Sequence, residues 1–125
     1  LGSLERNELM EEMKRCSCLV LPSLQETAPV VIGEAMAAGV PIAATHVGGL
    51  RWMLEGGRNG LLFDPSNTEE IAEALLQLLA DEELRNQLTR RALGWAHEHI
   101  HVDSVVRRTI QVYEQACQRK TRRPV

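Results

Sequence analysis

Runs of apolar residues separated by loop residues predict a strand, a helix and a second strand in the first half of the chain. Leu19–Leu21 is a short apolar run, which is typical of a strand buried on both faces. Val30–Ala38 is predicted to be helical, because Pro29 suits a first helical turn and Gly39 suits the position after the last turn, where φ is often positive. Pro41–Thr45 predicts the second strand. A strand, a crossover helix and a parallel strand form a right-handed βαβ unit.

The two loops that follow these strands form the predicted binding region. Ligands of open α/β sheets bind at the carboxyl ends of the strands. Pro22–Ala28 follows the first strand and His46–Gly49 follows the second, so both loops lie at that edge. Gly48 and Gly49 permit close backbone approach to a ligand, although the pair also fits a plain turn. His46 is a further candidate for ligand contact, with a solvated loop histidine as the alternative.

The rest of the pattern predicts one more strand and several helices. Asn7–Lys14 is expected to be a helix capped by Asn7, Leu50–Glu55 a short helix, and Gly60–Phe63 a third buried strand. A parallel sheet of few strands flanked by helices predicts an α/β fold, with a single domain over residues 1–125. One sheet edge is left unpaired in this arrangement, so we expect it to attract a homodimer partner.

Three helices are predicted in the second half of the chain. Ser66 with Glu69 has the pattern of a capping box, Asp81 is expected to cap the next helix, and the last helix begins near Asp103. Helical spacing predicts the inward faces of these three helices as Ile71, Leu75, Leu78 and Leu79; Leu84, Leu88, Ala92 and Trp95; and Val105, Thr109, Val112, Tyr113 and Ala116.

Two carboxylates give the predicted binding region its chemistry. Glu26 lies in the first loop and Glu34 lies about one turn into the helix, so both can face one crevice. The helix N-terminus beside them offers unpaired N–H groups and partial positive charge for a phosphate. A carboxylate accepts hydrogen bonds from sugar hydroxyls, so the combination indicates a nucleotide sugar. Taken alone, the two residues also fit a solvated loop glutamate and a solvated helix glutamate.

The segments PSLQE (22–26) and GEAMAAGVPIAATHVGG (33–49) resemble a motif of known glycosyltransferases. A pair of glutamates separated by seven residues, within PS-x-x-E and EAMA-x-G-x-P-V, marks the donor-binding C-terminal domain of retaining family 4 enzymes with the GT-B fold. Glu26 and Glu34 have this separation. The looser resemblance extends over residues 2–113.

The resemblance implies a role for each matching residue. Glu26 corresponds to the first glutamate, which lies near the donor sugar and has been assigned catalytic roles. Glu34 corresponds to the second, which accepts hydrogen bonds from the ribose hydroxyls. Thr27, Ala28 and Pro29 correspond to a segment, often Gly-Phe-Gly, whose backbone N–H groups reach the sugar or phosphate. Because proline has no N–H, the donors implied here are those of Thr27, Ala28, Val30 and Val31.

The resemblance also implies a function and a larger parent. It implies a Rossmann-like, partial GT-B C-terminal domain with C-terminal helices, in which a glycosyl group passes from a UDP- or GDP-sugar to an acceptor with retention. An N-terminal acceptor domain and the cations for the donor phosphates would lie before Leu1, so the chain alone is expected to be inactive. In the family the last helix crosses back toward that domain. The alternatives are a fragment of a GT-B-fold nucleotide-sugar epimerase and a non-catalytic, dimerising half-domain.

One position besides Pro29 departs from the family pattern. Trp52 stands where many members carry a glutamate after the glycine pair. The missing N–H of Pro29 is the departure that leaves open which sugar is bound and how tightly.

Composition excludes several classes of protein. The chain is 44% hydrophobic and 25% charged, as globular domains are, and its net charge of -3 is unlike that of a nucleic-acid-binding protein. No apolar run approaches the roughly 20 residues of a membrane span. Three cysteines without C-x-x-C spacing predict a reducing, cytoplasmic setting. Residues 119–125 form a basic tail that is expected to be disordered, with a weak attraction to the inner membrane face.

A group of histidines near the C-terminus is the one candidate for a metal site. His97 and His101 have the four-residue offset of helical metal ligands, with His99 between them. No third ligand is clearly placed beside them, so no metal site is predicted. No feature of the sequence requires a cofactor.

Overall fold

A computed structural model describes residues 2–121 of the chain, with side chains up to residue 118. The elements in chain order are α1 (Arg6–Arg15), β1 (Leu19–Leu21), α2 (Val30–Ala38), β2 (Ile42–Thr45), α3 (Leu50–Met53), the 3-10 helix η1 (Glu55–Gly57), β3 (Leu61–Phe63), α4 (Thr68–Ala80), α5 (Glu82–His99) and α6 (Val102–Thr121).

The three strands form one parallel sheet in the order β1-β2-β3. Ala44 of β2 pairs with Leu21 on one side and Leu62 on the other. The central strand is buried along its whole length, as its apolar sequence predicts. The predicted α/β fold with a few-stranded parallel sheet is therefore confirmed. Within residues 2–121, β1 and β3 are the edges.

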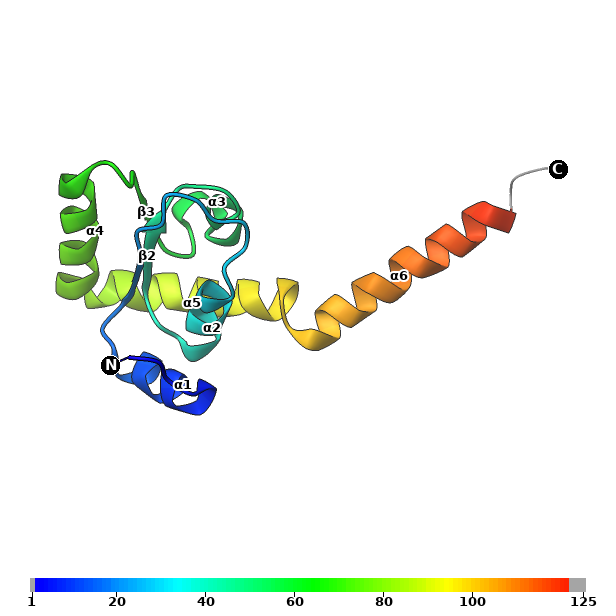
Figure 1. Cartoon of the computed structure of the whole chain (residues 1–125), viewed down its shortest axis with the longest axis horizontal. Coiled ribbons are helices and arrows are strands. Elements are labelled where there is room, and N and C mark those ends of the chain that lie inside the picture. The colour runs from blue at the N-terminus through cyan, green and yellow to red at the C-terminus, as the bar shows by residue number, and fades with distance from the viewer. Residues whose placement is uncertain (1, 122–125) are drawn as a thin grey trace.

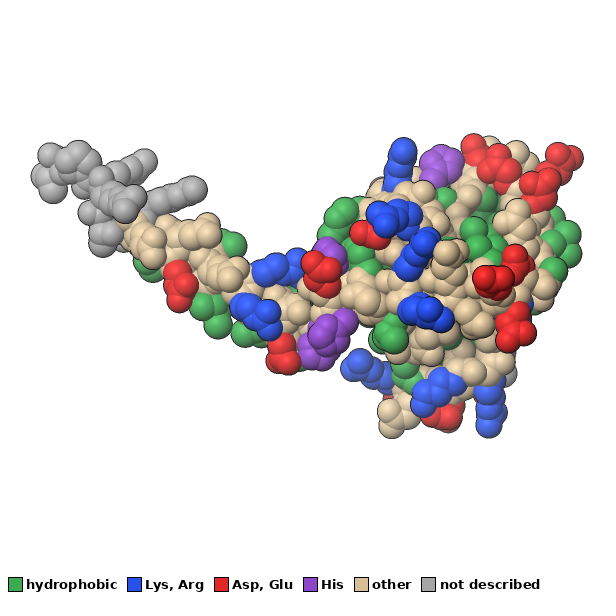
Figure 2. All heavy atoms as spheres, turned by 180° about the vertical axis from the view of Figure 1, so that it is seen from behind, with side chains coloured by type: hydrophobic (Ala, Val, Ile, Leu, Met, Phe, Trp, Pro, Cys, Tyr) green, Lys and Arg blue, Asp and Glu red, His purple; other side chains and the backbone are tan. Residues whose placement is uncertain are grey.

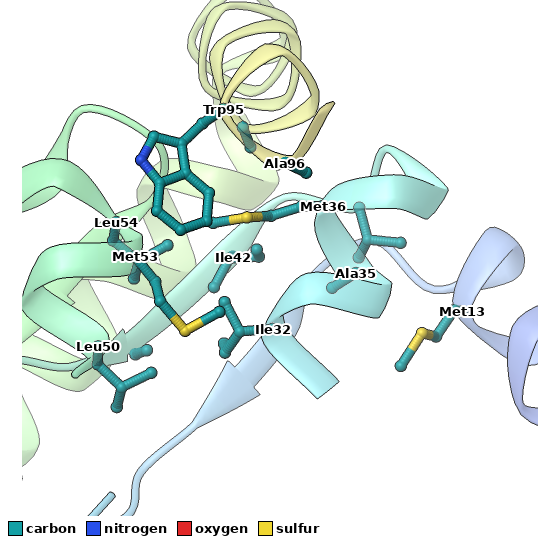
Figure 3. Close-up of a cluster of buried hydrophobic side chains, with 13 residues drawn as sticks. Met13, Ile32, Ala35, Met36, Ile42, Leu50, Met53, Leu54, Trp95 and Ala96 are labelled. Carbon is teal, nitrogen blue, oxygen red and sulfur yellow. The ribbon is translucent and has the colours of Figure 1, made fainter. Parts of the chain in front are cut away.

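Side chains alternate between the two faces of the sheet and build a separate cluster on each. Ile42 and Ala44 belong to the cluster shared with α1, α2 and α3, whereas Ala43 belongs to the cluster shared with α4. Helix α5 lies below the sheet in Figure 1 and contributes to both clusters, with Leu88 in one and Trp95 in the other. Figure 3 shows the larger cluster, in which side chains of α2, α3 and α5 converge.

Helix α2 connects β1 to β2 and ends as predicted. Gly39 adopts φ 71°, and its N–H and that of Val40 close the last turn. Pro29 lies one position before the helix, at its N-cap, with φ −68°. Ile32, Ala35 and Met36 bury the inner face completely, so the opposite face of α2 is left for Glu34.

Two predicted helix caps are wrong. Helix α1 begins one residue before Asn7, and the N–H of Glu5 donates to the Glu8 carboxylate at 2.9 Å. The cap of α4 is Asn67, whose side chain accepts from the N–H groups of Glu69 and Glu70. In both cases a neighbouring polar residue competes for the same role, and sequence alone does not rank the two.

One predicted inward face is wrong at a single residue, and another is wrong throughout. Leu79 on α4 is 56% exposed, although Leu78 beside it is completely buried. Helix α6 projects away from the body in Figure 1. Its predicted inward side chains, from Val105 to Ala116, are all exposed. Helix α6 continues to Thr121, and the remainder of the predicted tail, residues 122–125, lies outside the described residues.

Charge and apolar surface are unevenly distributed. Figure 2 shows acidic side chains gathered over the end of the body formed by α4 and the start of α5, where Glu69, Glu70, Glu82 and Glu83 lie in first helical turns. Apolar side chains remain uncovered along α6. Of the helices in residues 2–121, none is long and apolar enough to span a membrane.

Candidate functional site

The two loops at the carboxyl edge of the sheet lie against each other, backbone to backbone. A Cβ atom on Gly48 would lie 1.7 Å from the carbonyl oxygen of Glu26, and one on Gly49 would lie 1.7 Å from that of Thr27. Gly48 also has φ 51°, a conformation that other residues rarely adopt. The glycine pair is therefore required by contact with the loop that carries Glu26.

Two hydroxyl groups fix the Glu26 loop further. The Thr45 hydroxyl, at the end of β2, is completely buried and donates to the carbonyl of Ser23 at 2.7 Å. The Ser23 hydroxyl donates to the Glu26 carboxylate at 2.7 Å. The carboxylate is half-buried and keeps its second oxygen for another donor. These contacts hold Glu26 in one place at the edge of the sheet.

The N-terminus of α2 is open. Pro29 makes no side-chain cap, and the first turn contains no acidic residue. The first N–H groups of a helix have no partner within the helix, and the helix dipole places partial positive charge there. Val30 and Val31 supply such groups, although the side chain of Val31 itself packs against the core. This end of α2 can accept an anion such as a phosphate.

Glu34 lines a cavity of about 590 Å³ between α1, α2, α3 and the junction of α5 with α6. Ala28, Pro29 and Val30 line the same cavity, so it reaches the open end of α2. Within residues 2–121 the Glu34 carboxylate has no hydrogen bond or ion pair, and it is half-buried. An acceptor-only group without a partner, beside the open end of a helix, suits a polyol attached to a phosphate.

The predicted residues divide into two groups. The cavity brings together Ala28 and Glu34, whereas Glu26 and Thr27 face the glycine loop and do not line it. Sequence reasoning missed Ser23 and Thr45, although Ser23 is part of the motif that identifies Glu26.

His46 leaves this site and turns toward β3. Its Nδ1 lies 3.0 Å from the carbonyl oxygen of Phe63, and since a carbonyl only accepts, Nδ1 carries the hydrogen. Asp64 lies next to it. The hydroxyl and the N–H of Ser66 donate to Asp64 and lower the pKa of that carboxyl, with a smaller contribution from His46.

The histidine group does not form a metal site in the described part of the chain. His97 and His101 stack with ring centroids 5.0 Å apart, and His99 stacks on Trp95 instead. Between residues 2 and 121, no cluster of three or more His, Cys, Asp or Glu side chains is placed to hold a metal ion.

Comparison with known proteins identifies the family. The family model for glycosyl transferases group 1 matches residues 1–95. An uncharacterized glycosyltransferase of Methanocaldococcus jannaschii is 41% identical over 88 residues, which cover 70% of this chain and 25% of that protein. The chain spans less than a third of the length of such relatives, for example 25% and 30% of two of them.

Solved structures show the same fold. The sucrose-phosphate synthase of Thermosynechococcus elongatus superposes with a TM-score of 0.84 and 26% identity, over 94% of this chain and 30% of that one. HepE of Anabaena, solved in complex with UDP, superposes with a TM-score of 0.77 and 24% identity, over 84% of this chain and 29% of that one. The predicted resemblance to GT-B glycosyltransferases is confirmed, and the chain belongs to the group 1 glycosyl transferases.

Proposed function

We propose that this chain is the donor-binding part of a retaining glycosyltransferase that uses a UDP- or GDP-sugar. In the reaction, the bond between the anomeric carbon and the diphosphate breaks, and a bond to an acceptor oxygen forms on the same face of the sugar. The diphosphate leaves with the bonding electrons and takes up the proton that the acceptor hydroxyl releases, and positive charge near its oxygens stabilises it. The open N-terminus of α2 supplies part of that charge.

The observation that carries this proposal is the position of Glu34 and the absence of a partner for its carboxylate within the described residues. Glu34 lines the cavity beside the open end of α2 and has no partner among the described residues. The oxygens of this carboxylate are therefore available to accept hydrogen bonds from a ligand. Ribose hydroxyls are donors of the kind that such a carboxylate accepts.

The Glu26 loop completes the donor site. Glu26 receives one hydrogen bond from Ser23 and offers its other oxygen to the hydroxyls of the donor sugar. Backbone N–H groups of Thr27, Ala28, Val30 and Val31 are the proposed donors to the sugar and the phosphates. A protein of the same fold, HepE, is solved with UDP, so the fold accommodates a nucleoside diphosphate.

The chain alone is proposed to bind a donor without transferring its sugar. The acceptor site and the cations for the phosphates would belong to the part of the relatives that this chain does not cover. Helix α6 projects away from the body, and its side chains Val102, Val106 and Ile110 are exposed. We propose that this surface packs on an N-terminal domain, as the resemblance implies. A cytoplasmic location stays a prediction.

Titration calorimetry with UDP, GDP and their sugars tests the donor site. Glu34→Ala should weaken binding by about ten- to a hundredfold, because hydrogen bonds to a charged group contribute about 1.5–3 kcal/mol. Glu73→Ala, which removes an exposed glutamate on α4, is the matched control and should change nothing. Equal affinity of the Glu34→Ala variant would contradict the proposal. So would the absence of UDP and GDP binding by this chain.

A dimerising module is the second candidate function, because both sheet edges are unpaired within residues 2–121 and Leu76 and Leu79 of α4 are 65% and 56% exposed. Analytical ultracentrifugation separates the two functions. A dimer that binds no nucleotide would support the second candidate, and a monomer would exclude it.

A further inference from the structure

A second hollow, of about 530 Å³, lies between α3, η1 and the end of α5. Trp52 forms the wall between this hollow and the cavity that contains Glu34, since it lines both. Gly48 also contributes to the hollow, while its backbone lies against the carbonyl of Glu26. The hollow is therefore next to the proposed donor site without being part of it.

Two aromatic rings, those of Trp95 and His99, contact the ring of Trp52. Its ring meets the ring of Trp95 at a centroid distance of 4.8 Å and an angle of 75°, in an edge-to-face contact. Trp95 is 5% exposed and stacks on His99 with centroids 4.5 Å apart. His99 is held in turn, because its Nδ1 donates to the Trp95 carbonyl at 3.0 Å. Trp52 is nevertheless 58% exposed, so a rigidly held indole faces solvent.

Two polar side chains without partners line the same hollow as this indole. Arg51 and Glu55 line the hollow, and within the described residues neither side chain makes a hydrogen bond or ion pair. With Nδ1 of His99 occupied, Nε2 is the ring nitrogen that remains for a ligand. Among residues 2–121, Glu55 is the one non-glycine residue with positive φ, at 46°. Such strained positions are frequent at binding sites.

We propose that this hollow binds the pyranose ring of a glycoside. The apolar face of the sugar stacks on Trp52, while Arg51 donates to ring hydroxyls and Glu55 and His99 accept from them. A hollow lined by one aromatic face and several polar side chains suits a ligand of this chemistry. The inference does not depend on the proposed function, although the hollow lies beside the Glu26 loop, because Gly48 lines the hollow and contacts the carbonyl of Glu26.

Two-dimensional NMR of the full, ¹⁵N-labelled chain tests the proposal, because the chain has two tryptophans and hence two indole N–H signals. The probes are methyl α-D-glucopyranoside, methyl α-D-mannopyranoside and N-acetylglucosamine, each titrated to about 50 mM, which saturates a millimolar site. At least one should shift the signals of Trp52 and Gly48. Trp52→Ala should weaken this binding roughly tenfold, with Trp52→Phe in between. Tyr113→Ala removes an exposed aromatic ring on α6 and should have no effect.

Three results would overturn the proposal. The first is that no probe shifts these signals, and the second is that Trp52→Ala binds a probe as tightly as the unaltered chain does. The third is that the signals respond to protein concentration instead of the probe, which would indicate a contact between copies of the chain. A parallel titration with UDP keeps the two hypotheses apart. Glycoside binding without UDP binding would support the hollow and speak against the donor site. Shifts of Trp52 caused by UDP alone would assign the hollow to the nucleotide and overturn the inference.

Discussion

The loop that carries Glu26 and the helix that carries Glu34 are held in place by different physics. The loop makes few apolar contacts and is positioned by the buried hydroxyl of Thr45 and by backbone contact with Gly48. Helix α2 is positioned by a face of fully buried side chains, among them Ile32 and Met36. One glutamate therefore depends on directional contacts between loops, and the other on the hydrophobic core.

This difference separates stability from site geometry. Core packing is non-directional, so its loss destabilises the whole fold and leaves the surviving folded molecules with a similar site. Contacts between loops are local, so their loss moves Glu26 while most of the core remains. Substitutions in the core of α2 should therefore lower stability more than donor affinity. Substitutions at the contacts between the loops should lower donor affinity more than stability.

The largest loss of stability is expected from Met36→Ala. This change leaves a void in the cluster of Figure 3 and should lower the free energy of unfolding by about 4 kcal/mol, as large-to-small core substitutions do. UDP affinity, measured well below the lowered melting temperature, should change less than threefold. A large loss of affinity at that temperature would show that the core and the site are not separable.

Gly48→Ala should destabilise by about 3 kcal/mol, because the new Cβ overlaps the Glu26 carbonyl and the residue keeps a left-handed conformation. Donor affinity should fall more than in Met36→Ala. Gly56→Ala is the matched control: its φ of 64° is similar, and no atom lies within 4 Å of its added Cβ. That variant should lose only about 1 kcal/mol. Equal losses in both variants would show that strain alone, and not the contact between loops, requires glycine at 48.

Thr45→Val should cost about 1–2 kcal/mol, because it replaces a buried hydroxyl by a methyl group and leaves the Ser23 carbonyl without its donor. Thr109→Val is the control, since that hydroxyl donates to a helical carbonyl on exposed α6 at 2.9 Å. Chemical denaturation measures both. Unchanged stability and unchanged donor affinity in Thr45→Val would mean that the Thr45 hydroxyl does not hold the Glu26 loop in place.

Sequence alone predicted the elements of the sheet well, because their signals are local. The αL glycine after α2 and the apolar runs of all three strands act within a few residues. Helix caps were harder, as Ser66 shows: it lies one residue before Asn67, and both are good caps. The exposure of α6 could not be predicted, because its apolar spacing is the same whether or not a partner covers it.

The assignment of the candidate site residues stays a prediction, and their contacts could not be predicted from the sequence. The resemblance of the motif gave Glu26 and Glu34. The reason for the glycine pair lies in a contact between residues more than 20 positions apart, which no local pattern encodes. The rings of Trp52 and Trp95 likewise meet only through the packing of α3 against α5.

The smallest expected effect concerns the third loop at the same edge, after β3. Ser66 donates to Asp64 through its hydroxyl at 2.6 Å and its N–H at 2.8 Å, and these bonds lower the pKa of Asp64 from its ordinary value of 3.8. A lowered pKa in the folded state means that the folded protein favours the ionised carboxyl. The stabilisation is therefore present above the ordinary pKa and is lost as the pH falls through the lowered, folded-state value.

Ser66→Ala removes the hydroxyl and keeps the N–H, so the pKa of Asp64 should rise part of the way back, as a carboxyl-detected NMR titration would measure. The difference in melting temperature between this variant and the unaltered chain should be small at neutral pH and should vanish in acid. Ser104→Ala, whose hydroxyl donates to the His97 carbonyl, should show no such pH dependence between about pH 2 and 5. An unchanged pKa in Ser66→Ala would mean that the N–H alone holds the carboxylate. This third loop would then be set by its backbone, as the glycine loop is.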